Sequence, residues 1–89
     1  MKLSIIDITT KKHGIRSKIT INKKSIENHE LFTNIMHKYR GLKKGETGFF
    51  RLLDSTRSFK YYTYTRVGEA EKLLNTVFKE YKIKLEENA

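Results

Sequence analysis

Residues 57–66 read RSFKYYTYTR, and this stretch decides which fold the rest of the chain can adopt. In a β-strand, successive side chains point to opposite faces of the sheet. A strand here would place Lys60, Tyr62, Tyr64 and Arg66 on one face and Phe59, Tyr61, Thr63 and Thr65 on the other. One of these faces has to meet a core. The other then faces water and displays tyrosines between basic side chains.

Two amphipathic helices are predicted, one at residues 25–40 and one that begins after Thr65 or Val67 and runs to about Lys84. Each has one apolar stripe at the spacing of about 3.6 residues per turn. The stripes are Leu31, Phe32, Ile35, Met36 and Tyr39 in the first helix and Leu73, Leu74, Val77, Phe78 and Tyr81 in the second. Ser25 is a suitable N-cap for the first helix, and Gly41 a suitable residue to follow its C-terminus.

The two helices belong to a repeat with an offset of 42 residues, which relates every stripe residue of the second helix to one of the first. The same offset relates residues 60–63 to residues 18–21, directly before each helix. Further upstream, residues 48–52 (GFFRL) resemble residues 4–8 (SIIDI) at an offset of 44. The pseudo-repeat units, residues 1–41 and 45–86, then each read strand, turn, strand, helix. A chance match between two amphipathic helices is the alternative interpretation.

At 89 residues the chain is expected to form a single domain over residues 1–89. A lone ββα unit buries its sheet face poorly, so two such units should join. The predicted fold is α+β, with two tandem ββα units forming one four-stranded antiparallel sheet and both helices on one face. The other face of the sheet stays open.

The repeat also predicts which side chains face the helices. Ile19 and Ile21 are the apolar members of their strand and should point inward, which assigns Tyr61 and Thr63 to the core as well. For the outer strands, the same reasoning assigns Ile6, Ile8, Phe50 and Leu52 to the core. It leaves Ile5, Asp7, Phe49 and Arg51 on the open face.

The formal charge of +9 is concentrated in two segments of the chain. Residues 1–24 carry +6 and residues 40–66 carry +5, whereas residues 25–39 and 67–89 each carry −1. The basic excess therefore belongs to the predicted hairpins and connections and not to the helices. Such segregation indicates an acidic partner.

Aromatic rings between basic side chains on an open sheet are typical of surfaces that bind single-stranded nucleic acid, where bases stack on rings and cations follow the phosphates. The main hypothesis is therefore a small non-catalytic protein that binds RNA or single-stranded DNA. The expected binding residues on the open face are Arg16, Lys18, Phe49, Arg51, Lys60, Tyr62, Tyr64 and Arg66. Lys11 and Lys12 in the first turn, with Lys43 and Lys44 in the glycine-containing linker between the repeats, are expected to contact phosphates.

Three alternatives stay open at this point. Duplex DNA is less favoured, because neither helix is basic enough to read a major groove. A phage-type inhibitor that blocks a host toxin, nuclease or polymerase would use the same aromatic and arginine residues as an interface. The third alternative is a structural tyrosine row, since cross-strand tyrosine pairs stabilise hairpins without any ligand.

Other classes of function have little support in the sequence. No cysteine is present and no carboxylate cluster suits a metal, so no metal and no cofactor is expected. His13 could act as a general base in a ribonuclease, but nothing near it in sequence would orient it, and no catalysis is expected. No segment has the pattern of a signal peptide or a membrane span, so a cytoplasmic protein is predicted, either monomer or homodimer. The Lys-, Ile- and Asn-rich composition hints at a bacteriophage or a low-GC bacterium.

Overall fold

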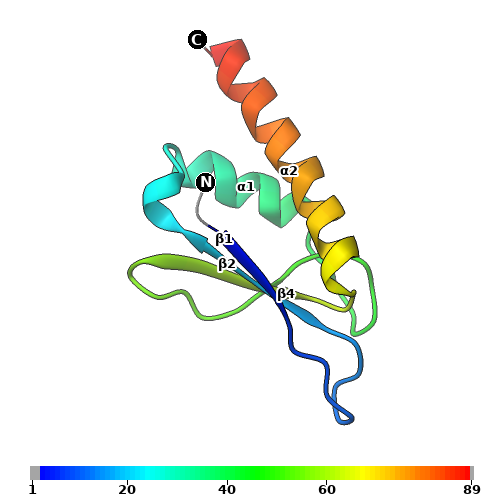
Figure 1. The fold of residues 1–89 in the computed structure, drawn as a ribbon. Coiled ribbons are helices and arrows are strands. Elements are labelled where there is room, and N and C mark those ends of the chain that lie inside the picture. Colours follow the sequence, from blue (N-terminus) through cyan, green and yellow to red (C-terminus); the bar gives the residue numbers. More distant parts are fainter. Residues whose placement is uncertain (1–2, 89) are drawn as a thin grey trace.

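The computed structural model describes the backbone of residues 3–88 and the side chains of residues 3–82. Its elements are β1 (Leu3–Asp7), β2 (Ser17–Asn22), the short 3₁₀ helix η1 (Lys23–Ser25), α1 (His29–Lys38), β3 (Phe50–Arg51), β4 (Ser58–Thr63) and α2 (Val67–Asn88). The strands form one four-stranded antiparallel sheet, and both helices lie on the same side of it (Figure 1). The predicted α+β class and ββα layout are therefore confirmed.

The sheet has the order β1-β2-β4-β3, so the second strand of each ββα unit lies at the centre. In the central pair, Ile19 lies opposite Tyr61, and these residues are 42 positions apart. In the helix layer, Lys38 Nζ contacts Glu80 Oε1, again across 42 positions. A pseudo-twofold axis between the two units would bring such pairs together.

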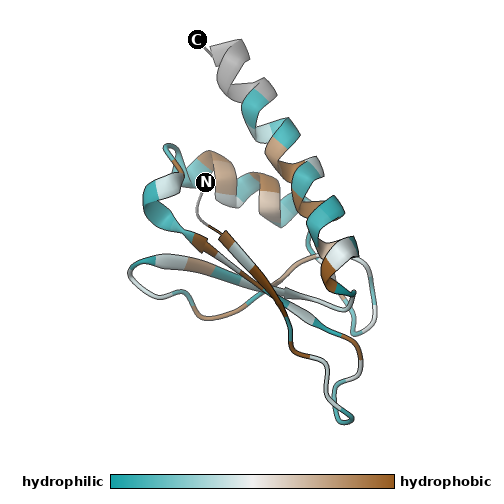
Figure 2. Cartoon of the chain, viewed as in Figure 1, coloured by the Kyte–Doolittle hydropathy of each residue, from teal (hydrophilic) through white to brown (hydrophobic). Residues whose placement is uncertain are grey.

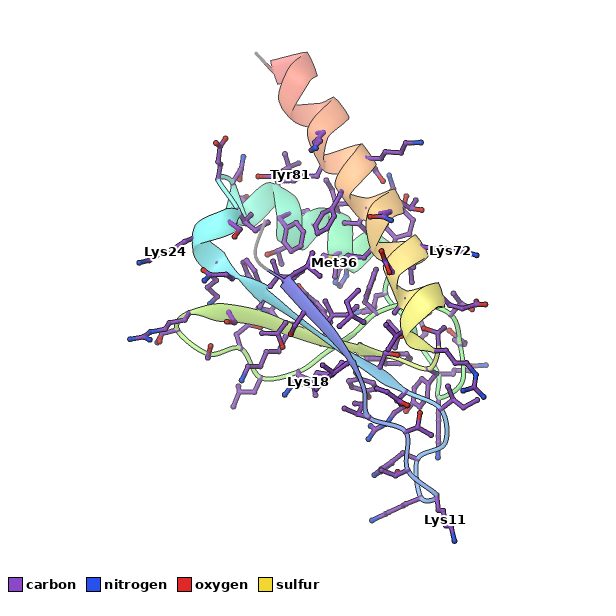
Figure 3. All side chains as sticks on the ribbon, viewed as in Figure 1. Lys11, Lys18, Lys24, Met36, Lys72 and Tyr81 are labelled. Carbon is purple, nitrogen blue, oxygen red and sulfur yellow. The ribbon has the colours of Figure 1, made fainter. Side chains whose placement is uncertain are left out.

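The core lies between the sheet and the helices. Ile19 and Ile21 from β2 and Tyr61 from β4 are buried, as the alternation in these strands predicts. They meet Phe32 on α1 and Leu74 on α2, both almost inaccessible to solvent. Figure 3 shows Met36 and Tyr81 between the layers and Lys18 on the opposite side of the sheet. The two central strands therefore separate the buried layer from an open face.

Helix α1 begins later than the sequence suggested. Asn28 is its N-cap, because the Asn28 side chain accepts a hydrogen bond from Leu31 N at 3.0 Å. The predicted N-cap, Ser25, instead ends η1, where Asn22 is the cap. Helix α2 begins at Val67 as predicted but continues to Asn88, past the expected end near Lys84, whose side chain lies outside the described residues.

The segment after α1 runs along β3 and covers that edge of the sheet. Phe49 N donates to Tyr39 O and Gly41 N donates to Phe49 O, both at 2.9 Å, so residues 39–41 add a short parallel pairing. Gly41 has no positive φ and is not the predicted residue at the helix C-terminus. It is needed because a β-carbon would lie 2.5 Å from the Phe50 ring. Gly48 has φ +147 and passes equally close to this segment.

The outer strands present the opposite faces from those predicted. Ile5 pairs with Ile19 and packs against the core, whereas Ile6 is 50% exposed on the open face. Likewise Phe49 is 1% exposed, and Phe50 pairs with Tyr62 on the open face. The predicted grouping of Ile6, Ile8, Phe50 and Leu52 on one face is retained, but that face is the open one. Adjacent apolar residues in both strands leave the choice of face to packing.

The outer surfaces of the helices are hydrophilic, and β1 is one of the most hydrophobic strands (Figure 2). Within the described residues, neither helix has an apolar stretch that would cross a bilayer.

Candidate nucleic-acid interface

The open face is the side of the sheet away from the helices. The described residues that line its centre are Ile6, Ile8, Arg16, Lys18, Thr20, Phe50, Leu52, Lys60, Tyr62 and Tyr64. None of these residues is acidic. One row crosses all the strands, because Ile6 pairs with Lys18, Lys18 with Tyr62, and Tyr62 with Phe50. The face therefore runs from aliphatic side chains on β1, through cations on β2, to rings on β4 and β3.

Phe50, Tyr62 and Tyr64 form an aromatic cluster on this face. The planes of Phe50 and Tyr62 are 17° apart and their centroids 5.2 Å apart. Rings lying flat and side by side on the sheet could not come so close, so these two rings stand upright and overlap face to face with an offset. Tyr64 meets both edge-on, at 5.1 Å from Phe50 and 5.7 Å from Tyr62. The cluster thus packs largely against itself.

Arg16 extends the stack on its other side. The Arg16 guanidinium carbon lies 5.3 Å from the centroid of the Tyr62 ring. Arg16 comes from the β2 side of β4 and Phe50 from the β3 side, so both faces of Tyr62 are occupied. Arg16 Nε is buried and has no hydrogen-bond partner among the described residues. The face therefore offers ring edges, tyrosine hydroxyls and one stacked guanidinium.

The Tyr62 hydroxyl stays protonated into the alkaline range. Burial, followed by a hydrogen bond with Tyr64, raises the pKa of Tyr62 above the usual value of 10.0. Arg16 opposes this shift by favouring the phenolate. The Tyr62 hydroxyl is thus neutral at physiological pH and can donate or accept hydrogen bonds.

The cations of this face have no carboxylate partner in the described part of the chain. The ion pairs there involve Asp54, with Lys23 at 3.8 Å and Arg51 at 2.8 Å, and Glu80, with Lys38. Arg16, Lys18 and Lys60 take part in none of them. Their charges are therefore available to an anionic ligand.

Three of the predicted binding residues do not lie on the open face. Phe49 is in the core, and its predicted place is taken by Phe50. Arg51 pairs with Tyr61 on the helix side, where a hydrogen bond to Asp54 raises the pKa of the Arg51 guanidinium. Arg66 lies beyond β4, directly before α2. Hydrogen bonds with Thr9 lower the pKa of Asp7, and the charge of Arg66 adds a smaller contribution in the same direction. The open face is consequently less basic and more apolar than predicted.

The remaining predicted residues flank the open face. Lys11 and Lys12 lie exposed at the tip of the hairpin between β1 and β2, which projects beyond the sheet (Figures 1 and 3). Lys43 and Lys44 are exposed in the linker beside β3. Hydrogen bonds at Gly41 and from Leu42 N to Glu46 Oε2 fold this linker along the sheet edge.

The histidines do not assemble a catalytic group. His29 Nε2 lies 2.9 Å from Lys23 O, and its ring meets Phe59 edge-on. His13 lies in the hairpin tip, where its backbone N–H donates to Thr10 Oγ1. In the part of the chain with described side chains, no three His, Cys, Asp or Glu side chains are placed to hold a metal ion.

Sequence reasoning missed Phe50, Leu52, Ile6 and Ile8 as open-face residues. The sequence did contain a signal that relates them, because its pattern places all four on one face.

Comparison with known proteins adds no further assignment: the chain matches no family model, no curated protein and no solved structure.

Proposed function

We propose that the protein binds single-stranded nucleic acid, RNA or single-stranded DNA, through the open face. The observation that carries the proposal is the set of unpaired cations Arg16, Lys18 and Lys60 beside an aromatic cluster, on a face without carboxylates. Cations on adjacent β-strands of an open face suit the phosphates of an extended nucleic-acid strand. Neither helix supplies a basic surface for a major groove, so duplex is the less favoured ligand.

The upright rings suggest how bases would be held. The ring faces of Tyr62 are occupied by Phe50 and Arg16, so a base would meet ring edges and the hydroxyls of Tyr62 and Tyr64. The Arg16 guanidinium over Tyr62 adds a cation beside these groups for a phosphate or a base edge. Hydrogen bonding by hydroxyls then matters more than stacking on tyrosine faces.

The test is titration of a labelled short single-stranded RNA, followed by fluorescence anisotropy at several salt concentrations. Contact with three phosphates should give a slope of log K against log salt of about −2, and Lys18→Gln should reduce its magnitude by about 0.7. Lys72→Gln, on the exposed surface of α2, is the control and should leave the slope unchanged. A wild-type affinity that does not change with salt would refute the phosphate contacts.

A second comparison separates the two modes of base recognition. Tyr64→Phe keeps the ring and removes the hydroxyl, so it should weaken binding nearly as much as Tyr64→Ala. If Tyr64→Phe binds like the wild type while Tyr64→Ala does not, bases stack on the ring instead.

One observation favours a second candidate, a protein partner such as a host protein that this chain would inhibit. Ile6 is half exposed on the same face as the aromatic cluster, with Lys18 between them, and a face that combines exposed apolar side chains, tyrosines and an arginine is typical of protein interfaces. Such an interface would be much less sensitive to salt. A partner protein that binds the Lys18→Gln variant as it binds the wild type, but does not bind the Ile6→Lys variant, would favour this candidate.

A further inference from the structure

A basic hollow lies at the end of the sheet where β2 passes into η1 and the loop before β4 turns back. It has a volume of about 390 Å³ and is lined by Asn22, Lys23, Lys24, Thr56 and Arg57. No acidic residue lines it. We propose that this hollow binds the terminal phosphate of a nucleic-acid strand that lies on the open face, an inference that rests on the proposed function.

The backbone of the hollow is held by its own hydrogen bonds. Lys23 N donates to Arg57 O at 2.8 Å, which continues the ladder between β2 and β4 by one step. Lys24 N donates to Asn22 Oδ1 at 2.9 Å, and Arg57 N donates to Ser55 Oγ at 3.3 Å. The cationic side chains therefore project from an ordered frame and not from a free loop.

The charges of the hollow are incompletely balanced within the chain. Lys23 and Arg57 are opposite one another across the ladder, an arrangement of like charges that destabilises a sheet. Lys23 is partly neutralised, with Nζ at 3.8 Å from Asp54 Oδ2 and 5.1 Å from the centroid of the Phe59 ring. Lys24 and Arg57 are exposed and form no ion pair with a described carboxylate. An anion at this position would relieve the repulsion.

The charge of the hollow matches a phosphate monoester better than an internal phosphodiester. The hollow has three cations, and the one carboxylate nearby, Asp54, also pairs with Arg51 at 2.8 Å, so the hollow keeps a net charge of at least +2. A terminal phosphate carries about −1.5 to −2 at neutral pH, whereas each phosphate within a strand carries one negative charge. Arg57 adds the planar donor fork that suits phosphate oxygens.

The hollow also lies where a nucleic-acid strand bound along the open face would reach the end of the β-sheet. The pair Asn22 and Ser58 lies two residues beyond the pair Thr20 and Lys60, so its side chains are on the same open face. Asn22 also lines the hollow and therefore connects the two surfaces. The path from Lys18 to Asn22 covers four residues of β2, about 13 Å. A ligand that follows the cations of β2 in this direction therefore ends at Lys24 and Arg57.

The test compares three forms of one short single-stranded RNA, with a 5′-phosphate, with a 3′-phosphate and with hydroxyls at both ends. The wild type should bind one phosphorylated form about tenfold more tightly than the unphosphorylated form. Arg57→Gln and Lys24→Gln should each reduce this preference while retaining the affinity for the unphosphorylated RNA. Lys72→Gln is the control and should keep the full preference, and thermal unfolding followed by circular dichroism confirms that all variants are folded.

The outcomes separate the two proposals. Equal affinity of the wild type for all three RNAs would overturn the terminal-phosphate site and leave nucleic-acid binding by the open face intact. A preference that survives both substitutions would place the phosphate elsewhere and also overturn it. No binding of any form would refute the proposed function and this inference with it.

Discussion

The neighbouring phenylalanines at the start of the third strand, Phe49 directly before β3 and Phe50 inside it, provide the sharpest test of the sheet. Phe49 is 1% exposed in the core, whereas Phe50 is partly exposed on the open face, one residue further along. We expect Phe49→Ala to cost about 3–5 kcal/mol, as for other buried phenylalanines. For a domain of this size the whole free energy of unfolding is about 5–15 kcal/mol, so this change removes a large part of it.

Phe50→Ala should cost much less. It loses the stacked pair with Tyr62, worth about 0.5–1.5 kcal/mol beyond the buried area, and part of the transfer energy of one ring. We therefore expect a total of about 2 kcal/mol. Unlike Phe49→Ala, this substitution should also weaken binding at the open face, because Tyr62 loses its support.

The assay is urea denaturation followed by far-ultraviolet circular dichroism, with the wild type and both variants at equal concentration. The difference in midpoint multiplied by a common slope gives each change in the free energy of unfolding. If Phe49→Ala does not fold, Phe49→Leu and Phe50→Leu provide the same comparison with smaller losses. A larger loss for Phe50 than for Phe49 would refute the observed register and restore the faces expected from the sequence.

Three further predictions concern a glycine pair, a cap and pH. Gly48→Ala should destabilise the protein by about 2 kcal/mol or more, since the φ of +147 and backbone atoms 2.6 Å away leave no room for a β-carbon. Gly68→Ala in α2 should stabilise it by about 0.5 kcal/mol, because a β-carbon there meets nothing within 4 Å. Thermal denaturation of both variants measures the contrast, and equal effects would contradict it. Asn28→Ala should cost about 1 kcal/mol through loss of the N-cap of α1, and Asn28→Asp should recover most of it in the same urea assay. Burial raises the pKa of both Tyr61 and Tyr62 above 10.0, so the stability they contribute is fully present below pH 10.0 and is lost as the pH rises through their folded pKa values. A hydrogen bond to Glu80 also raises the pKa of Tyr39, so tyrosinate absorbance during an alkaline titration should show three late-titrating tyrosines. A single unshifted transition would contradict these environments.

The central strands were predictable because their side chains alternate without ambiguity. In β2 and β4 every second residue is apolar or buried, and the repeat makes the two strands support one another. Each outer edge of the sheet has two adjacent apolar residues, Ile5 and Ile6 in β1, and Phe49 directly before β3 with Phe50 inside it. Either face could then be the buried one, and the choice is made by packing against α2 and by the close pairing of residues 39–41 with Phe49.

The candidate site was predictable in its centre and not at its ends. Lys60 and Tyr62 lie where alternation places them, because they belong to a regular strand, and Tyr64, directly after its end, still joins the aromatic cluster. Arg66 follows Thr63 by three residues, and the strand has already ended there. The mutual stacking of the rings depends on distances across strands, which local sequence patterns do not contain.

The absence of tryptophan gives the aromatic cluster a practical use. The chain has five tyrosines, and two of them, Tyr62 and Tyr64, lie on the open face. Near-ultraviolet emission of the unlabelled protein therefore comes from tyrosine alone, with a substantial share from the cluster. A ligand that reaches these rings should quench or shift that emission, so the protein carries its own optical reporter of an occupied surface.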